Sequence, residues 1–328
     1  MATTFIPGRG LGAGISLRRE FLPELSKRAE AGDPEVTNRI RWLEVMPENF
    51  IGRGGTVRRA LLFLASKFPI AFHSVSLSLG STDPLDRELL KEVKLLARET
   101  GAKWVTDHLS FASVGGAQFH NLLPMPFTQK SAKFFANRIS QAQDILELPL
   151  GFENPSYYIR LPAPPGETEI SEAEFISAVL EKSETFLLLD INNVFVNSVN
   201  HSGWKGGSFE PALKCAREFL DSIPLDRIRE VHIAGHEETD VRGKPLLLDN
   251  HGASVRREVR ALLKYLNEKQ KISTLLLERE MNIPPLDDVL SEAHLLWRSV
   301  HPGTVHAFVQ TPKTRTLLSG HSVQERSK

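Results

Sequence analysis

The stretch Val231–His251, VHIAGHEETDVRGKPLLLDNH, is the segment from which the fold of this chain can be inferred. It opens with a short apolar run that contains one histidine and ends in glycine, which predicts a buried strand. The charged run 237–244 predicts a loop, and three leucines then lead to a carboxylate and a last histidine. An imidazole buried in a strand without a hydrogen-bond partner destabilises the fold by roughly 1–3 kcal/mol. The histidine of this strand therefore indicates a functional site.

The polar side chains of this stretch are three imidazoles and one carboxylate, from His232, His236, Asp249 and His251. Such a set suits a divalent transition metal. Any one of these histidines alone is more simply explained as a hydrogen-bonded core residue. The rest of the chain must therefore show whether further ligands converge on the same place.

Seven other apolar segments resemble this strand, and each is followed by a segment whose apolar residues have helical spacing. The eight predicted strands are 12–17, 42–46, 70–77, 104–108, 150–154, 186–190, 228–234 and 274–280. The predicted helices are 19–31, 57–68, 86–100, 128–146, one capped by Ser171 with Glu174 three residues later, 210–220, 253–268 and 286–297. The polar segment around Gly115-Gly116 and the glycine-rich segment 197–207 are predicted to be loops.

Strands separated by helices are parallel, and eight such units close into a barrel. We predict an α/β fold, a TIM-type (β/α)8 barrel in a single domain over residues 1–300, followed by a polar, flexible tail over residues 301–328. A doubly wound open sheet is the rival fold. Its phosphate-binding glycine motif follows a strand, whereas the glycines near residue 8 precede one.

The composition narrows the classes of function. Lys+Arg and Asp+Glu are 40 each, so no net field favours nucleic acid or an anionic membrane. The single cysteine, Cys215, forms no internal disulfide and offers no CxxC motif. The sequence has neither an apolar leader nor a run of about 18 apolar residues. These features predict a cytoplasmic protein that does not cross a membrane.

Catalytic groups of a (β/α)8 barrel lie at the C-terminal ends of the strands, on one rim. Potential ligands occur at six consecutive strand ends of this chain: His73, Asp107-His108, Glu153-Asn154, Asp190 with Asn193, His232 with His236, Asp249 and His251, and Glu278. More than four ligands indicate more than one metal ion, with a carboxylate such as Glu153 as the bridge. Histidine and carboxylate without cysteine suit iron, manganese or zinc, so both dioxygen-activating iron and water-activating zinc remain open.

Ten motifs together resemble the DUF692 family (UPF0276), described as multinuclear non-haem iron-dependent oxidative enzymes. The motifs are GAGISLR (12–18), WLEVMPENF (42–50), HSVSLSLG (73–80), DHLSF (107–111), HNLLPMPFT (120–128), GFENPSYY (151–158), LLLDINNVFVNSVNH (187–201), VHIAGH (231–236), LLLDNHG (246–252) and LLEREMNIP (276–284). The resemblance covers the chain from about Gly10 to Val300 and also implies the TIM-type barrel.

The resemblance implies two or three iron ions and a set of matching ligands. These are His73, His108, Glu153, Asp190, Asn193, His232, Asp249, His251 and Glu278. Some members carry histidine where this chain has Asn193, and an amide is a weaker ligand than an imidazole. Candidates for a catalytic role beyond the metal ligands are His236, His201 and Asn154.

The same resemblance implies a dioxygen-dependent oxidase that modifies cysteine residues of a ribosomally made precursor peptide. A small partner protein that delivers the peptide is implied as well. The loops 155–166 and 197–207 are candidates for the peptide groove. Two alternatives remain: a zinc or manganese barrel hydrolase or isomerase, like endonuclease IV or xylose isomerase, and a metal-holding barrel that only binds a partner. Neutral net charge argues against nucleic acid as the substrate.

Overall fold

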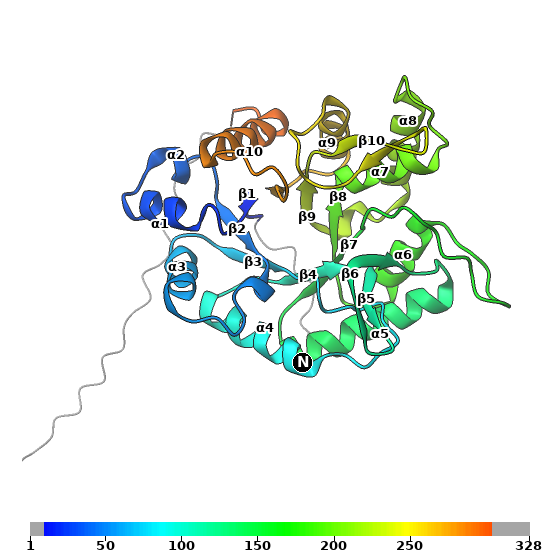
Figure 1. Ribbon diagram of the computed structural model, residues 1–328, viewed down its shortest axis with the longest axis horizontal. Helices are drawn as coiled ribbons and strands as arrows, with labels where there is room; N and C mark the ends of the chain where they lie inside the picture. The colour runs from blue at the N-terminus through cyan, green and yellow to red at the C-terminus, as the bar shows by residue number, and fades with distance from the viewer. Residues whose placement is uncertain (1–9, 304–328) are drawn as a thin grey trace, which may run out of the picture.

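Eight parallel strands close into a barrel in the computed structural model, which describes residues 10–303. Their order around the barrel is β1-β12-β9-β8-β7-β4-β3-β2 (Figure 1). The strands are β1 (Gly12–Ser16), β2 (Trp42–Val45), β3 (Ile70–His73), β4 (Val105–His108), β7 (Leu150–Glu153), β8 (Leu187–Asp190), β9 (Ile228–Ile233) and β12 (Thr274–Leu277). The predicted TIM-type barrel is therefore confirmed. The predicted tail lies outside the described residues beyond residue 303.

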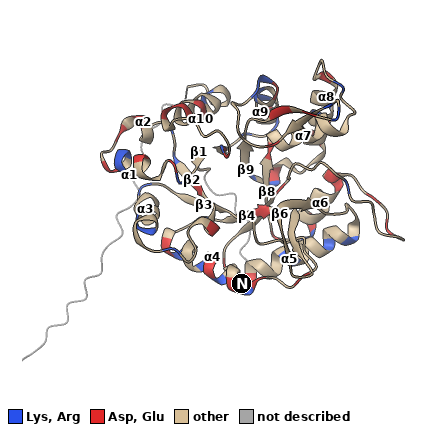
Figure 2. Cartoon of the chain, viewed as in Figure 1, with Lys and Arg blue, Asp and Glu red and all other residues tan. Residues whose placement is uncertain are grey.

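Helices surround the barrel and connect its strands (Figure 1). They are α1 (Leu22–Glu30), α2 (Pro34–Thr37), α3 (Gly55–Ala65), α4 (Arg87–Thr100), α5 (Gln129–Leu146), α6 (Glu172–Lys182), α7 (Ile191–His201), α8 (Glu210–Ser222), α9 (Arg257–Lys269) and α10 (Leu286–Val300). The predicted capping box of Ser171 and Glu174 starts α6. None of the helices described here is long and apolar enough to cross a membrane. Lys and Arg residues alternate with Asp and Glu residues along these elements (Figure 2).

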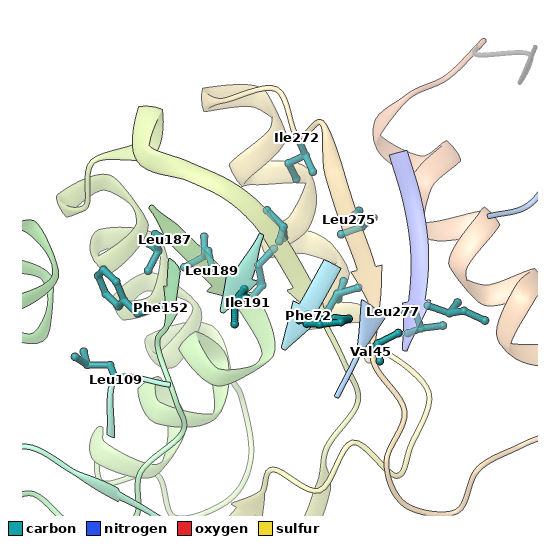
Figure 3. Close-up of a cluster of buried hydrophobic side chains, with 14 of the residues drawn as sticks. Val45, Phe72, Leu109, Phe152, Leu187, Leu189, Ile191, Ile272, Leu275 and Leu277 are labelled. Carbon is teal, nitrogen blue, oxygen red and sulfur yellow. The ribbon is translucent and has the colours of Figure 1, made fainter. Parts of the chain in front are cut away.

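Alternate strand residues face the helices and form the main apolar core. Figure 3 shows such side chains from several strands, including Val45, Phe72, Phe152, Leu189 and Leu277. Each is at most 1% exposed. Because side chains alternate along a strand, the intervening residues point into the barrel.

A second apolar cluster lies inside the barrel and consists of Trp42, Ala71, Trp104, Phe186 and Leu276. Each residue stands two or four positions before a polar residue in or directly after the same strand, so the cluster lies toward the N-terminal end of the barrel. We call it the aromatic plug. Two glycines make room for it, because an added Cβ at Gly14 or Gly151 would overlap the ring of Trp42 or Phe186, respectively.

Two segments predicted as loops are β-hairpins. The run 237–244 belongs to the pair β10 (Glu237–Val241) and β11 (Lys244–Leu248), and the segment around Gly115-Gly116 joins β5 (Ser110–Val114) to β6 (Ala117–Pro124). Both hairpins turn through two residues with positive φ: 57° and 79° at Arg242-Gly243, and 61° and 77° at Gly115-Gly116. That conformation matches the twist of the paired strands. The strands were predicted as loops because their sequences are polar.

The segment after Asp190 is helical, which corrects the prediction of a loop from residue 197. In α7 the apolar residues Ile191, Val194, Phe195 and Val199 are all buried. Asp190 caps the helix by accepting a hydrogen bond from the backbone N–H of Asn193. The helix was missed because the asparagines of INNVFVNSVNH have low helix propensity, although the apolar residues have helical spacing. Residues 203–209 do lie outside any helix.

Candidate metal centre

The predicted ligands converge at the C-terminal rim of the barrel, where four overlapping clusters bring ligand atoms within 4.8 Å of one another. The first cluster is His73, His108 and Glu153, and the second is Glu153, Asp190 and His232. The third is Asp190, His251 and Glu278, and the fourth is Glu44, His232 and Glu278. All members are buried. Seven of the nine predicted ligands belong to a cluster; Asn193 and Asp249 contact cluster members instead.

In the first cluster, two imidazoles turn the same nitrogen toward one carboxylate. Nε2 of His73 lies 3.0 Å from Oε2 of Glu153, and Nε2 of His108 lies 3.3 Å from the same oxygen. Nδ1 of His73 is 2.8 Å from Oγ1 of Thr106, whose hydroxyl donates to the carbonyl of residue 72. Nδ1 of His73 must therefore donate, which leaves its Nε2 as the ligating nitrogen. Nδ1 of His108 faces Asp107 at 3.3 Å.

Asp190 and Asn193 are held at the start of α7. Oδ1 of Asp190 accepts the capping hydrogen bond of that helix, whereas its Oδ2 is buried without a hydrogen-bond partner. The side-chain amide of Asn193 donates to Oε1 of Glu153 at 3.0 Å and to the carbonyl of Asn154 at 3.1 Å. Its Oδ1 is buried and unpartnered. Both residues therefore offer a free oxygen next to Glu153.

His251 and Asp249 approach the rim from the segment after the hairpin of β10 and β11. Nε2 of His251 lies 2.8 Å from Oδ1 of Asp249, and its Nδ1 lies 3.4 Å from Oε2 of Glu278. Asp249 also accepts hydrogen bonds from Ser156 at 2.8 Å and Asn192 at 2.7 Å. His251 has a φ of 50°, a region that residues other than glycine seldom adopt. Such conformations cluster at functional sites.

Sequence reasoning missed two buried carboxylates that contact His232. Nε2 of His232 lies 2.8 Å from Oε2 of Glu44 and 3.3 Å from Oε1 of Glu230. The available signal was an acidic residue inside a strand that is otherwise apolar, in WLEV and IREVHI. The meeting itself depends on barrel closure, because Glu44 and His232 are 188 residues apart.

Burial and mutual charge shift the titration of the metal-free site. Burial would lower the pKa of His73, but Glu44 and Glu153 outweigh it and raise the pKa to about 10. Burial, with the charge of Glu153, raises the pKa of Asp190 to about 8. Burial opposes ionisation of Glu278 as well, yet the imidazoles of His251 and His232 hold its pKa well below the ordinary value. Protons thus occupy positions that metal ions would take.

The donor set fits metal ions. Asp190 Oδ2 and Asn193 Oδ1 are buried without a hydrogen-bond partner, and Oε2 of Glu153 and the ring nitrogens of His251 contact only other charged members or neighbours of the clusters. Unpaired buried polar atoms are costly, and these two oxygens lie beside Glu153. Nitrogen and oxygen donors without sulfur suit iron, manganese or zinc.

The three candidates for a catalytic role lie in different surroundings. Asn154 uses its amide to bond the backbone N–H and C=O of Asp190, at 2.9 and 3.1 Å, which favours a positioning role. His236 is fully buried, with Nδ1 2.7 Å from Asn192 Oδ1 and Nε2 unpartnered. The structure does not bring His201 into any of the four clusters. Its ring stacks on Tyr157 at 4.7 Å, beside a separate cavity of about 690 Å³.

Gly235 controls the position of the segment that carries His251. A Cβ at Gly235 would overlap the backbone carbonyl of Ala253, so Gly235→Ala is expected to displace that segment. We expect a loss of about 1–3 kcal/mol in the free energy of unfolding and a weaker third cluster. Thermal unfolding and metal content measure both effects. Gly54→Ala is the matched control, because its Cβ meets open space. Wild-type melting and metal content in Gly235→Ala would contradict the prediction.

Fold and site together define a TIM-type barrel with a candidate metal centre at its C-terminal rim. Residues 12–300 match the family model described as RiPP precursor modification enzyme MbnB/TglH/ChrH. A UPF0276 protein of Nitrosospira multiformis is 37% identical over 279 residues, covering 85% of this chain and 89% of the relative. A UPF0276 protein of Acinetobacter baylyi is 39% identical over 274 residues, covering 84% and 86%. The chain belongs to this family, the DUF692 (UPF0276) family that its motifs indicated.

Solved structures of other barrels resemble this one at low identity. L-ribulose 3-epimerase gives a TM-score of 0.54 at 14% identity, covering 88% of this chain and 95% of that chain. Endonuclease IV from Thermus thermophilus gives a TM-score of 0.53 at 14% identity, covering 88% of this chain and 98% of that chain. Identities this low establish the shared barrel fold and leave the activity open.

Proposed function

We propose that this chain is a multinuclear non-haem iron enzyme that uses dioxygen to modify cysteine residues of a ribosomally made precursor peptide. The observation that carries the proposal is the sharing of carboxylates between clusters. Glu153 belongs to the first and second clusters, and Asp190 belongs to the second and third. Bridging carboxylates are how proteins hold two metal ions close together. Membership of a RiPP precursor modification family supports a peptide substrate.

The nine predicted ligands would hold two or three iron ions. The three clusters linked by Glu153 and Asp190 supply seven of them, and Asn193 and Asp249 add an oxygen each from the edge. When bound, iron would supply electrons to dioxygen and a cationic site at which a peptide thiol loses its proton. Mixed histidine and carboxylate ligands with open positions are typical of iron that reacts with dioxygen.

The chain's own residues would receive the peptide at the barrel mouth. Tyr158, Ile159, Leu248 and Met281 are exposed by 44%, 55%, 38% and 55%, which is unusual for large apolar side chains. Two of them adjoin the centre: the hydroxyl of Tyr158 accepts from the N–H of Asp249, and Leu248 directly precedes Asp249. Exposed apolar groups that rim a polar site suit a peptide or a partner that delivers one.

His236 would act in its neutral form. Burial, together with the charge of Arg256, lowers its pKa to about 4. Its Nδ1 donates to Asn192, so its Nε2 keeps a lone pair that no described group uses. That nitrogen is fully buried, so His236 would act by orienting Asn192, whose side-chain amide donates to Oδ1 of Asp249 at 2.7 Å.

Anaerobic purification and metal analysis test the function. We expect more than one equivalent of iron per chain, consumption of dioxygen, and a mass change in a Cys-containing precursor peptide. The same peptide with serine in place of cysteine is the matched control and should stay unchanged. Stoichiometric zinc without a redox response would favour a hydrolase or isomerase instead. Iron that consumes dioxygen without changing any peptide would favour a barrel that only binds a partner.

A further inference from the structure

Two buried carboxylates beneath the metal centre have no part in the function proposed above. Glu44 is 4% exposed and Glu230 is fully buried, on β2 and β9. Burying a carboxylate is costly unless it is paired. Both carboxylates face the same atom, Nε2 of His232, at 2.8 and 3.3 Å. The side chain that both carboxylates contact is therefore that imidazole.

The two nitrogens of His232 have different surroundings. Nε2 faces Glu44 and Glu230, whereas Nδ1 lies 3.2 Å from Oε2 of Glu278, a member of the third cluster. A neutral imidazole has one N–H donor and one acceptor nitrogen. Both nitrogens face carboxylate oxygens in the metal-free protein, but Nδ1 faces a member of the third cluster, whereas Nε2 faces two carboxylates outside the first three clusters. A metal ion held with Glu278 would therefore take the lone pair of Nδ1 and leave the hydrogen on Nε2, toward Glu44 and Glu230.

We propose that Glu44 and Glu230 are positioning residues that fix the hydrogen of His232 on Nε2 and so present Nδ1 as its ligating nitrogen. The proposal rests on the metal centre proposed above, but it is independent of iron, dioxygen and peptide. Metal-binding histidines generally donate their second N–H to a carboxylate or another acceptor. His73 and His108 follow this rule with the opposite nitrogens, since their Nδ1 atoms face Thr106 and Asp107.

Glu230 is itself anchored to the aromatic plug. Its Oε2 accepts a hydrogen bond of 2.7 Å from Nε1 of Trp104, and the guanidinium of Arg229 lies 4.5 Å from the centre of the Trp104 ring. Its other oxygen faces His232. The chain of contacts from Trp104 through Glu230 to His232 ties the orientation of one ligand to the packed floor of the barrel.

The test compares a substitution of Glu44 that keeps a hydrogen-bond acceptor for His232 with one that removes it. Glu44→Gln keeps a side-chain oxygen for the N–H of His232, whereas Glu44→Leu removes it; Glu218→Leu on the exposed face of α8 is the control. Each full-length protein is loaded anaerobically with zinc alone. We measure zinc per chain, zinc affinity by competition with a chelator, and the tautomer of His232 by ¹⁵N NMR of histidine-labelled protein.

We expect Glu44→Gln to bind the wild-type amount of zinc with Nδ1 of His232 coordinated and Nε2 protonated. Glu44→Leu should bind zinc about 10–100-fold more weakly, as the loss of such a partner does elsewhere. Loss of one zinc equivalent in Glu44→Gln would overturn the proposal, because Glu44 would then be a direct ligand of the fourth cluster. Coordination of wild-type His232 through Nε2 would overturn it as well.

The outcomes also separate this proposal from the proposed oxidase function. A protein that binds zinc as expected but consumes no dioxygen with iron disproves the oxidase and leaves the role of Glu44 intact. Should Glu44→Leu fail to fold, zinc binding by Glu230→Gln and the tautomer of His232 in the wild-type protein still test the proposal. Glu230→Gln keeps an acceptor for Trp104 and should hold the wild-type zinc content, with an affinity reduced by less than about tenfold.

Discussion

Replacing Glu153 with alanine is expected to remove more than one equivalent of metal from each chain. Glu153 is the member common to the first and second clusters, and its Oε2 lies within 3.3 Å of two imidazole nitrogens. Without the carboxylate, the two clusters each lose a ligand, and the positive metal ions lose the negative charge between them. Metal analysis after anaerobic loading with iron measures the effect.

Two controls separate this effect from a general loss of structure. Glu218→Ala changes the same kind of side chain on an exposed helix face, and His294→Ala removes a histidine of α10 outside the four clusters. Both should keep the full metal content. Thermal unfolding of metal-free Glu153→Ala shows whether the barrel remains folded. Full metal content in folded Glu153→Ala would disprove the bridging role.

Metal affinity is expected to rise by at least about 100-fold for each pH unit between about pH 6 and pH 8. In the metal-free protein, neighbouring carboxylates overcome burial to raise the pKa of His73 to about 10, and burial raises that of Asp190 to about 8. Below pH 8 both side chains hold a proton that an incoming metal ion must displace. Burial would lower the pKa values of His232 and His251, but neighbouring carboxylates hold them well above 6.5, so these rings carry further protons. Displacement of at least two protons changes the affinity by at least two powers of ten per pH unit.

Competition with a chelator at several pH values measures this slope. Asp190→Asn removes one titrating group, so the rise in its affinity should be about tenfold smaller per pH unit than in the wild type, even though its affinity is lower throughout. A slope near zero in the wild-type protein would show that neither group is protonated before binding.

The same shifts predict how pH affects the metal-free fold. His73 has a pKa raised above its ordinary 6.5, so its contribution to stability is complete below that value and is lost as pH rises toward 10. Asp190 ionises near 3.8 in the unfolded chain and near 8 in the fold, so stability falls as pH rises through that interval. Both effects destabilise the metal-free protein at high pH.

The sequence predicted most of the barrel and most members of the four clusters because both follow local rules. Buried strands read as short apolar runs, and groups at their C-terminal ends meet on one rim whatever the details of packing. His73, His108, Glu153, Asp190, His232 and Glu278 were found by this rule. Glu44 and Glu230 were not, because one acidic residue in a short strand does not reveal which face it occupies or which residue across the barrel it meets.

The loop predicted from residue 197, which contains His201, illustrates the opposite error. As part of a flexible loop His201 was free to reach the rim, but α7 fixes its distance from Asn193. Eight residues of helix rise about 12 Å, which carries His201 away from the clusters and onto Tyr157. A correct assignment of α7 required the apolar spacing of Ile191, Val194, Phe195 and Val199 to be weighed above the low helix propensity of asparagine.

The aromatic plug closes one end of the barrel. Trp42, Trp104 and Phe186 are at most 2% exposed and pack together on the side opposite the rim. In the proposed oxidase, dioxygen and the peptide would therefore both approach the centre from the rim. A bound peptide would then restrict the access of dioxygen, so the order in which the two bind would matter as much as their affinities.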